Sequence, residues 1–550
     1  MKNFKKILYA GGVVASLLMF NSCQSDITSL NEDPKHPSSV PSGNMLATSM
    51  YQGFYYMYTG SVNFNNYRFF TQQWTETTYT QETNYNLTTR NQPRNHFRRM
   101  YVYTLAPLEQ AKKDLPSEIN ADPDVVDNKW ATLEIASVFT WENIVDTFGN
   151  VPYKEALQAE TIKSPKYDDA KTIYLDLISR LNVAISKIHT TKAGYPEDLV
   201  YKGDMSKWVK LANSIKLRLA INLADVDPAT SKAVAESAIS GGVLASATDS
   251  YSLKFDGNTF TNPLFDDLVA AGRNDFVPSN VIVNPMNAKS DPRRHSYFDE
   301  NLVKATVTGV TPPTSPSTST TVTLSSLPTN IAVGQSVYVA SSVPSIFVGT
   351  VSSIGSNSIT INNAGSIAIN NSLAFGYYKG GTYGTQNSYA NNSHVNPTYL
   401  TGNAPANLFS YTEVLFLKAE AAQRGYNVGA GTAASLYADA ITASMLENGL
   451  TAGDAATYIT ANPYNAANWK QSIGYEGWVA MWNNPFAAWN FARRLDNPVL
   501  TPPPSSYIGG IPYRMPYSDQ EYVTNNANVS AAATAIGGDK ATTKLFWDIN

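Results

Sequence analysis

Apolar side chains that recur at three- and four-residue intervals constrain this 550-residue chain more than any other feature. Residues 170–188 carry the clearest example, an unbroken stripe formed by Ile173, Tyr174, Leu177, Ile178, Leu181, Ala184, Ile185 and Ile188. This period is typical of a helix with one buried face. The same spacing predicts helices at 131–145, 208–223 (after Asp204 as N-cap), 413–422 and 433–446. Antiparallel helix pairs would bury these stripes against one another, so we expect a mainly α fold.

One segment departs from this pattern. Residues 305–378 contain no Asp, Glu, Lys, Arg or His, and they begin with a low-complexity stretch, TPPTSPSTST. Alternating apolar pairs follow at Val322/Leu324, Val337/Val339, Val348/Val351 and Ile359/Ile361. Such runs, separated by Gly, Asn, Pro and Ser, predict a small all-β sandwich or barrel inserted into the helical chain. The insert is either an accessory binding or spacing module, or a tolerated surface-loop insertion.

The N-terminus reads as an export signal. Lys2, Lys5 and Lys6 precede an uncharged run over 7–20, which is shorter than the ~20 residues that span a bilayer. Asn21 and Ser22 then lead into Cys23, the only cysteine. This arrangement predicts a bacterial lipoprotein signal over 1–22, with Cys23 acylated and anchoring the mature protein to a membrane. The alternative is a plain secretory peptide, in which Cys23 is incidental.

Composition and motifs exclude several function classes. The net charge is -4 and only 15% of residues are charged, so there is no basic excess to neutralise nucleic acid. The five histidines are scattered without metal-binding spacing, and Walker A and nucleophile-elbow motifs are absent. Gly429, Gly431 and Ala434 match GxGxxA but follow a helix instead of a strand. We therefore predict no enzyme, no metal and no cofactor.

Clustered acidic residues have ordinary explanations. Asp122, Asp124 and Asp127 lack the glycine and terminal glutamate of a calcium loop, and we expect an exposed acidic loop there. Glu413 and Glu420 lie seven residues apart on one predicted helix face. Paired carboxylates can serve glycoside hydrolysis, but here we expect them to pair with Lys or Arg or to cap backbone.

Tyrosines in polar loops are the candidate binding residues. The stretch 75–94 is aperiodic, and a Gly/Asn-rich loop follows the insert. Flat aromatic faces beside amide and guanidinium donors suit a sugar ring, and they suit a peptide equally well. Trp74, within FFTQQW, is expected to pack inside a helix. The predicted substrate-binding residues are Tyr79, Asn84, Tyr85, Arg90, Tyr297, Tyr383 and Tyr389, with Tyr297 expected to join the loop after the insert.

A series of segments, in order along the chain, resembles the SusD/RagB family of outer-membrane nutrient-binding lipoproteins, particularly its SusD-like branch. Each segment alone is weakly specific, but their order is very specific. They cover nearly the whole mature chain except the insert. The segments are LNEDPKHPS (30–38), FTWENIVDTFGNVPYKEAL (139–157), PKYDDAKTIYLDLISRL (165–181), YKGDMSKWVKLANSIKLRLA (201–220), NPLFDDL (262–268), DPRR (291–294), YTEVLFLKAEAAQRGY (411–426), GWVAMWNNPFAAWNFARRLDNPVL (477–500) and IPYRMPYSDQEYVTNN (511–526).

The resemblance implies a fold and a role. It implies tetratricopeptide-like helix pairs covered by loops, with a helical body over 23–304 and 379–550 and the charge-free module between them. It also implies a lipid-anchored protein, facing the cell exterior, that captures an oligomeric nutrient and acts as a lid for a SusC-like TonB-dependent transporter. A glycan cargo is favoured over a peptide. The family's binding residues follow no fixed motif, so none is transferred to this chain.

Two other function classes compete with this hypothesis. One is a secreted glycan hydrolase with an accessory β module, which substrate turnover by the purified protein would reveal. The other is a surface scaffold whose helix pairs dock other proteins, which predicts protein partners but no affinity for small ligands.

Overall fold

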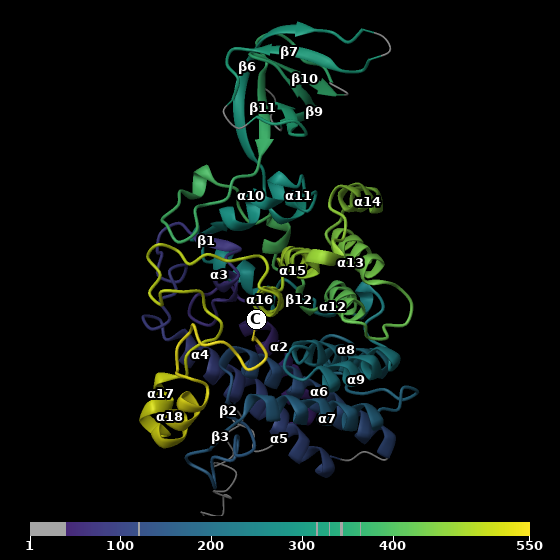
Figure 1. Cartoon of the computed structure of the whole chain (residues 1–550), viewed down its shortest axis with the longest axis vertical. Helices are drawn as coiled ribbons and strands as arrows, with labels where there is room; N and C mark the ends of the chain where they lie inside the picture. The colour runs from purple at the N-terminus through teal and green to yellow at the C-terminus, as the bar shows by residue number, and fades with distance from the viewer. Residues whose placement is uncertain are drawn as a thin grey trace, which may run out of the picture.

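The computed structural model describes residues 40–118, 122–314, 317–328, 331–340, 345–362 and 365–549. The predicted signal segment and Cys23 lie outside the described residues. Within them, a helical body is topped at one end by a small β-barrel (Figure 1). The prediction of a mainly α protein with an inserted all-β module is confirmed.

Four pairs of consecutive helices form the frame of the body. In each pair the second helix packs against the first, and pairs that are distant in sequence also touch, as α12 does with α8 and α15. This is the predicted tetratricopeptide-like arrangement. The pairs are α6 (Pro123–Phe148) with α7 (Ala170–Ser186), α8 (Met205–Asn222) with α9 (Pro228–Ser240), α12 (Tyr411–Gln423) with α13 (Ala433–Glu447), and α15 (Trp469–Ala480) with α16 (Pro485–Leu495).

Local sequence explains where these helices begin. Asp169 caps α7 by accepting a hydrogen bond from Thr172 N, and Asp204 caps α8 through Ser206 N. The stripe predicted for α7 is buried from Ile173 to Ala184, and only its last two members are partly exposed. The helix ends at Ser186, so Ile188 lies beyond it.

Helix α6 extends further than its apolar stripe predicts. It begins at Pro123, with Asp122 as its N-cap, and it includes Asp124 and Asp127. The expected acidic loop is therefore wrong: the three carboxylates start a helix, where negative charge is stabilised by the helix dipole. Lys187 and Lys192 also bind Asp127 and Asp122.

Shorter elements cover the frame. Trp74 is buried, as expected for a packing residue, but it lies on strand β1 and not in a helix. The further helices are α2 (Ser42–Tyr58), α3 (Tyr67–Phe70), α4 (Gln92–Arg98), α5 (Ala106–Asp114), α10 (Asn280–Ala288), α11 (Arg294–Tyr297), α14 (Ala452–Ala461), α17 (Asp519–Thr524) and α18 (Asn526–Ala535), with π-helical turns at η3 (Arg99–Leu105) and η6 (Phe265–Ala270). The antiparallel strand pairs are β1 (Trp74–Glu76) with β5 (Phe276–Pro278), β2 (Val151–Pro152) with β3 (Tyr167–Asp168), and β4 (Tyr251–Leu253) with β12 (Ala406–Phe409).

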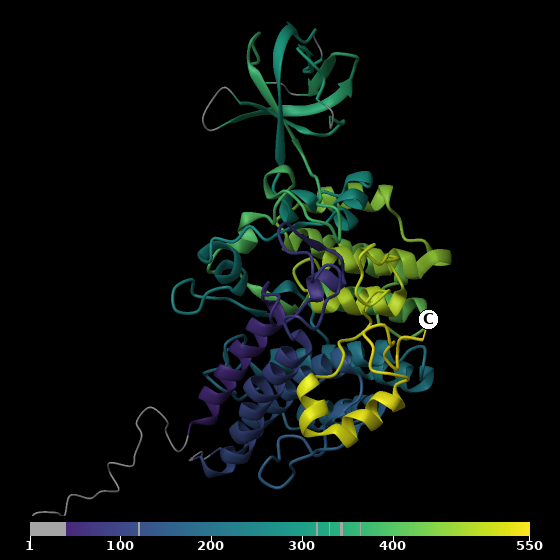
Figure 2. The same cartoon turned by 90° about the vertical axis from the view of Figure 1, so that its left-hand side faces the viewer.

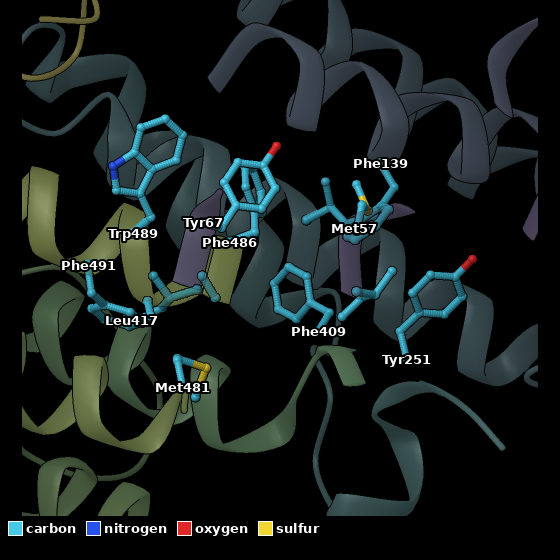
Figure 3. Close-up of a cluster of buried hydrophobic side chains, with 14 of the residues drawn as sticks. Met57, Tyr67, Phe139, Tyr251, Phe409, Leu417, Met481, Phe486, Trp489 and Phe491 are labelled. Atoms are coloured by element: carbon cyan, nitrogen blue, oxygen red, sulfur yellow. The ribbon is translucent and has the colours of Figure 1, made fainter. Parts of the chain in front are cut away.

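One hydrophobic core joins the two halves of the body across the insert. Figure 3 shows side chains from α3, α6, β12 and α16 meeting in it, among them Tyr67, Phe139, Phe409 and Trp489. The rings of Tyr67 and Trp489 lie 5.5 Å apart, although more than 400 positions separate them in the sequence. The chain segments before and after the insert therefore fold as a single unit.

The insert is a closed barrel with its own core. Its strands are ordered β10-β7-β6-β11-β8-β9, and all neighbouring pairs are antiparallel. The apolar pairs predicted from the sequence all lie on strands and point into the barrel. The strands are β6 (Asn301–Thr311), β7 (Thr320–Leu324), β8 (Ser336–Val339), β9 (Ile346–Ile354), β10 (Ser358–Asn362) and β11 (Ser372–Tyr377).

The barrel stands apart from the body on a narrow neck (Figure 2). Its first strand begins at Asn301, ahead of the charge-free segment, and therefore includes Lys304. Asn301 pairs with Tyr377, so the chain enters and leaves the barrel at the same place. Glu300 links the barrel to the chain that leaves it. Its carboxylate accepts hydrogen bonds from the hydroxyls of Tyr338, on β8, and Tyr378, just after β11, at 2.8 and 3.3 Å.

Candidate ligand-binding surface

Three loops that are distant in sequence meet on one side of the body. Asn84, in the loop after β1, donates through Nδ2 to Gly384 O at 2.8 Å. The backbone carbonyl oxygen of Asn84 accepts a hydrogen bond from Tyr507 N at 2.8 Å. Gln72 adds a further link by donating to Thr501 O. The two aromatic loops predicted from the sequence are thus neighbours, and a third loop, around 499–510, joins them.

Several of the predicted binding residues hold these loops together from inside. Tyr85 and Tyr383 are buried with ring centroids 6.2 Å apart, and the Tyr383 hydroxyl donates to Phe69 O. Burial raises the pKa of Tyr85 to about 12. Asn84 is buried with them. Their side chains are surrounded by protein, so the geometry gives them a supporting role and does not favour direct contact with a ligand.

Two tyrosines remain available at the surface of this loop cluster. Tyr79 is 50% exposed and Tyr507 is 64% exposed. The Arg90 guanidinium lies 5.8 Å from the centre of the Tyr79 ring and is held there by Glu82, whose Oε1 accepts from Arg90 Nε at 2.7 Å. A guanidinium on a ring restrains it and supplies free N–H donors beside it. Residues 75–94 and 499–510 thus present flat apolar faces with polar donors nearby.

Sequence reasoning missed Tyr507. It follows the run TPPPSS and precedes Ile-Gly-Gly. This composition indicates a loop, and from it an exposed tyrosine could have been predicted. Only its contact with Asn84 shows that this loop lies against the predicted one.

The other two predicted residues lie elsewhere. Tyr389 is partly exposed and stacks on His394 at 3.9 Å, with the rings 14° from parallel, so one of its faces is covered. The ring of His394 donates a hydrogen bond to the Asp299 carboxylate, which raises the pKa of His394. Tyr297 is buried and stacks on Trp482 at 5.6 Å. Its ring packs beside Tyr399 and its backbone carbonyl accepts a hydrogen bond from Asn396 N at 3.0 Å, so Tyr297 does contact the chain after the insert, beyond Tyr383 and Tyr389.

A buried pair of carboxyl groups underlies the exposed loop. Glu76 Oε2 accepts hydrogen bonds from the backbone N and hydroxyl of Thr83, and Glu82 is adjacent. Burial, followed by the neighbouring Glu82, raises the pKa of Glu76 to about 9. Glu76 is therefore protonated at neutral pH. A neutral, buried acid next to a carboxylate braces the loop but has no access to a substrate.

The carboxylates that could suggest hydrolysis are also occupied. Glu413 binds Arg218 at 3.0 Å, and Glu420 binds both Arg494 and Arg424 at 3.0 Å. These ion pairs confirm the expected pairing with basic residues. Both glutamates are also buried. Within the described residues, no cluster of three His, Cys, Asp or Glu side chains could hold a metal ion.

Comparison with known proteins agrees with this architecture. The model of a SusD-like family, described as "starch-binding associating with outer membrane", matches residues 34–337 and 362–518. The chain belongs to the SusD-like family. The gap in the match, 338–361, lies within the barrel. A search of curated proteins finds no match.

Solved structures share the SusD-like fold. A chitin-binding protein is 23% identical, with a TM-score of 0.70 over 92% of this chain and 100% of the other. A chitin-binding SusD homologue from Flavobacterium johnsoniae is 21% identical, with a TM-score of 0.67 over 92% and 99%. A SusD homologue from Bacteroides ovatus is 22% identical, with a TM-score of 0.68 over 92% and 99%. In the described part of this SusD-like chain, no helix is long and apolar enough to cross a bilayer.

Proposed function

We propose that this protein captures a neutral oligosaccharide at the outer membrane through the surface formed by Tyr79, Arg90 and Tyr507. The observation that carries the proposal is the pair of exposed tyrosines on loops joined through Asn84. A sugar ring has an apolar C–H face that packs on an aromatic ring and hydroxyls that bind amide and guanidinium groups. The body fixes the loops, so little entropy is lost when the ligand binds.

A glycan is a better cargo than a peptide for this surface. The guanidinium of Arg90, which lies beside the exposed Tyr79 ring, is already paired with Glu82, and residues 499–510 carry no charged side chain. An oligopeptide with charged termini and side chains would find few counter-ions, whereas a neutral glycan needs none. The chitin-binding relatives and the family description also support a glycan. Peptide capture by the same surface remains the competing hypothesis.

The membrane role is part of the same proposal. Acylation of Cys23 would anchor the protein in the outer membrane, with the body facing the cell exterior. A SusC-like TonB-dependent transporter would receive the glycan, with this protein as its lid. A Cys23→Ala variant and a gene deletion should both reduce growth on the cognate oligosaccharide, because capture would no longer occur beside the transporter. Undiminished uptake in the deletion strain would exclude the transport role.

Calorimetric titration of residues 24–550 against matched panels of oligosaccharides and peptides tests the capture step. We expect one class of neutral oligosaccharide to bind, and Tyr79→Ala and Tyr507→Ala each to weaken binding by about threefold to tenfold, because stacking on an aromatic ring contributes on the order of 0.5–1.5 kcal/mol. Phe260→Ala is the matched control, since Phe260 is equally exposed but packs on Tyr51, outside the three loops.

Other outcomes would favour other functions. Saturable binding of peptides alone would replace the glycan by a peptide. Turnover of an oligosaccharide by the purified protein would favour the hydrolase hypothesis. Recovery of protein partners without affinity for either panel would favour the scaffold.

A further inference from the structure

A second possible site lies apart from the three loops. A cavity of about 420 Å³ opens between strands β4 and β12, helix α11, the turn η8 (Pro397–Leu400) and the C-terminal ends of α13 and α15. Its floor includes the buried side chains of Tyr297, Ser410 and Met481. Thr398 and Glu447 line its exposed mouth. Its size is within the range of small-molecule sites in proteins.

The chemistry of the walls restricts what could enter. Hydroxyl and amide side chains from Ser, Thr, Asn and Tyr dominate the lining, which contains no Lys, Arg or His, and Glu447 is its only charged residue. An anion, or a free amino acid with its carboxylate, would lose its hydration without gaining a counter-ion. A neutral molecule rich in hydroxyl groups carries no charge whose hydration must be replaced, and its hydroxyls can bind the polar side chains of the walls.

Polar atoms in and beside the cavity lack partners. Asn407, in the wall, has a buried Oδ1 atom without a hydrogen-bond donor among the described residues. The hydroxyls of Tyr297 and Ser444 lie near one another, but neither makes a hydrogen bond of good geometry within the described chain. These three atoms lie behind the surface that a water-sized molecule in the cavity can touch, so the other hydroxyl and amide groups of the walls are the ones available to a ligand.

We propose that this cavity binds one neutral sugar unit, with hydroxyl groups that hydrogen-bond to the hydroxyl and amide side chains of its walls. The volume equals that of about 14 water molecules in the liquid, and a hexose has about twelve non-hydrogen atoms, each smaller than a water molecule, so one ring fits with room for ordered water. The site is separate from the surface of Tyr79, Arg90 and Tyr507 and does not depend on that surface binding an oligosaccharide.

Methyl NMR of residues 24–550 labelled at methionine provides the test. Met481 is buried on the cavity floor, and Met481→Leu assigns its signal. The probes are glucose and N-acetylglucosamine, with glycine and glucuronate as charged controls, each raised to about 10 mM because single sugar units bind weakly. We expect a saturable shift of the Met481 methyl with a neutral sugar and none with glycine or glucuronate. No shift with either sugar, or an equal shift with the charged probes, would overturn the proposal.

Variants separate the two sites. Thr398→Trp should block the mouth and abolish the shift, while Thr460→Trp, at an exposed position on α14, should leave it unchanged. Tyr79→Ala and Tyr507→Ala should leave the Met481 titration intact, even if both abolish oligosaccharide binding. A Met481 shift that survives Thr398→Trp, or disappears in Tyr79→Ala, would exclude a separate sugar site.

Discussion

At the scale of single residues, burial decides which polar groups can serve a ligand. Tyr79 and Tyr85 are both tyrosines of one polar loop, and the sequence does not distinguish them. Tyr85 packs against Tyr383 and is fully buried, while Tyr79 is half exposed beneath the guanidinium of Arg90. The same loop hides the protonated Glu76 next to Glu82.

Glu76 should make the stability of the protein depend on pH. Its pKa rises from about 4.3 in an unfolded chain to about 9 in the folded state. The stability that the proton contributes is therefore present below the unfolded pKa and is lost as the pH rises toward 9. Glu76→Gln mimics the neutral acid, so we expect a free energy of unfolding higher by on the order of 3–5 kcal/mol at pH 8 and by only about 1 kcal/mol at pH 5.

Urea denaturation at a series of pH values measures this effect. Glu160→Gln is the control, because Glu160 is exposed. Equal effects of Glu76→Gln at pH 5 and pH 8 would show that Glu76 is ionised in the folded protein.

At the scale of elements, a buried ion-pair network holds helices of different pairs against one another. Arg218 on α8 binds Glu142 on α6 at 2.5 Å and Glu413 on α12 at 3.0 Å, and all three side chains are almost fully buried. Its guanidinium also lies 4.1 Å from the centre of the Phe409 ring on β12. One arginine thus connects the helices before the insert with those after it.

Removing this arginine should destabilise the protein strongly. Arg218→Met leaves two buried carboxylates without a counter-ion, and we expect a loss of about 3–5 kcal/mol in the free energy of unfolding, measured by denaturant titration. The triple variant with Glu142→Gln and Glu413→Gln should recover much of the loss, because no unpaired charge remains. A loss below about 1 kcal/mol for Arg218→Met would contradict a structural role for the network.

At the scale of the whole molecule, the barrel is an addition to a body that is complete without it. The barrel has its own core, and the body's core joins segments on both sides of it. Asn301 pairs with Tyr377 at the neck, so the two ends of the barrel are neighbours.

Excising residues 301–377 and joining Glu300 to Tyr378 through two glycines should therefore leave a folded body. The bridge is short because the two ends already pair, so closing the chain costs little entropy. We expect the thermal midpoint of the body and its affinity for the oligosaccharide to remain close to those of the intact protein, as measured by calorimetry. Collapse of expression, or loss of binding, would show that the barrel contributes to the body or to the site.

Sequence periodicity predicted much of the fold because it is a local property. The stripes of α7, α8, α12 and α13, and the alternating pairs of four barrel strands, depend on neighbours within one element. The acidic start of α6 and the strand at Trp74 were predicted wrongly, since a cap and a three-residue strand depend on contacts beyond the local pattern.

The tertiary structure alone decided the candidate site. The sequence marked two aromatic loops but could not show that they meet, that Tyr507 joins them, or that Asn84, Tyr85, Tyr297 and Tyr383 are buried. Nor could it show the cavity, whose walls come from segments between 247 and 484. Exposure and proximity depend on which distant segments pack together. Helix caps and apolar stripes depend only on residues within a few positions, and these the sequence determined by itself.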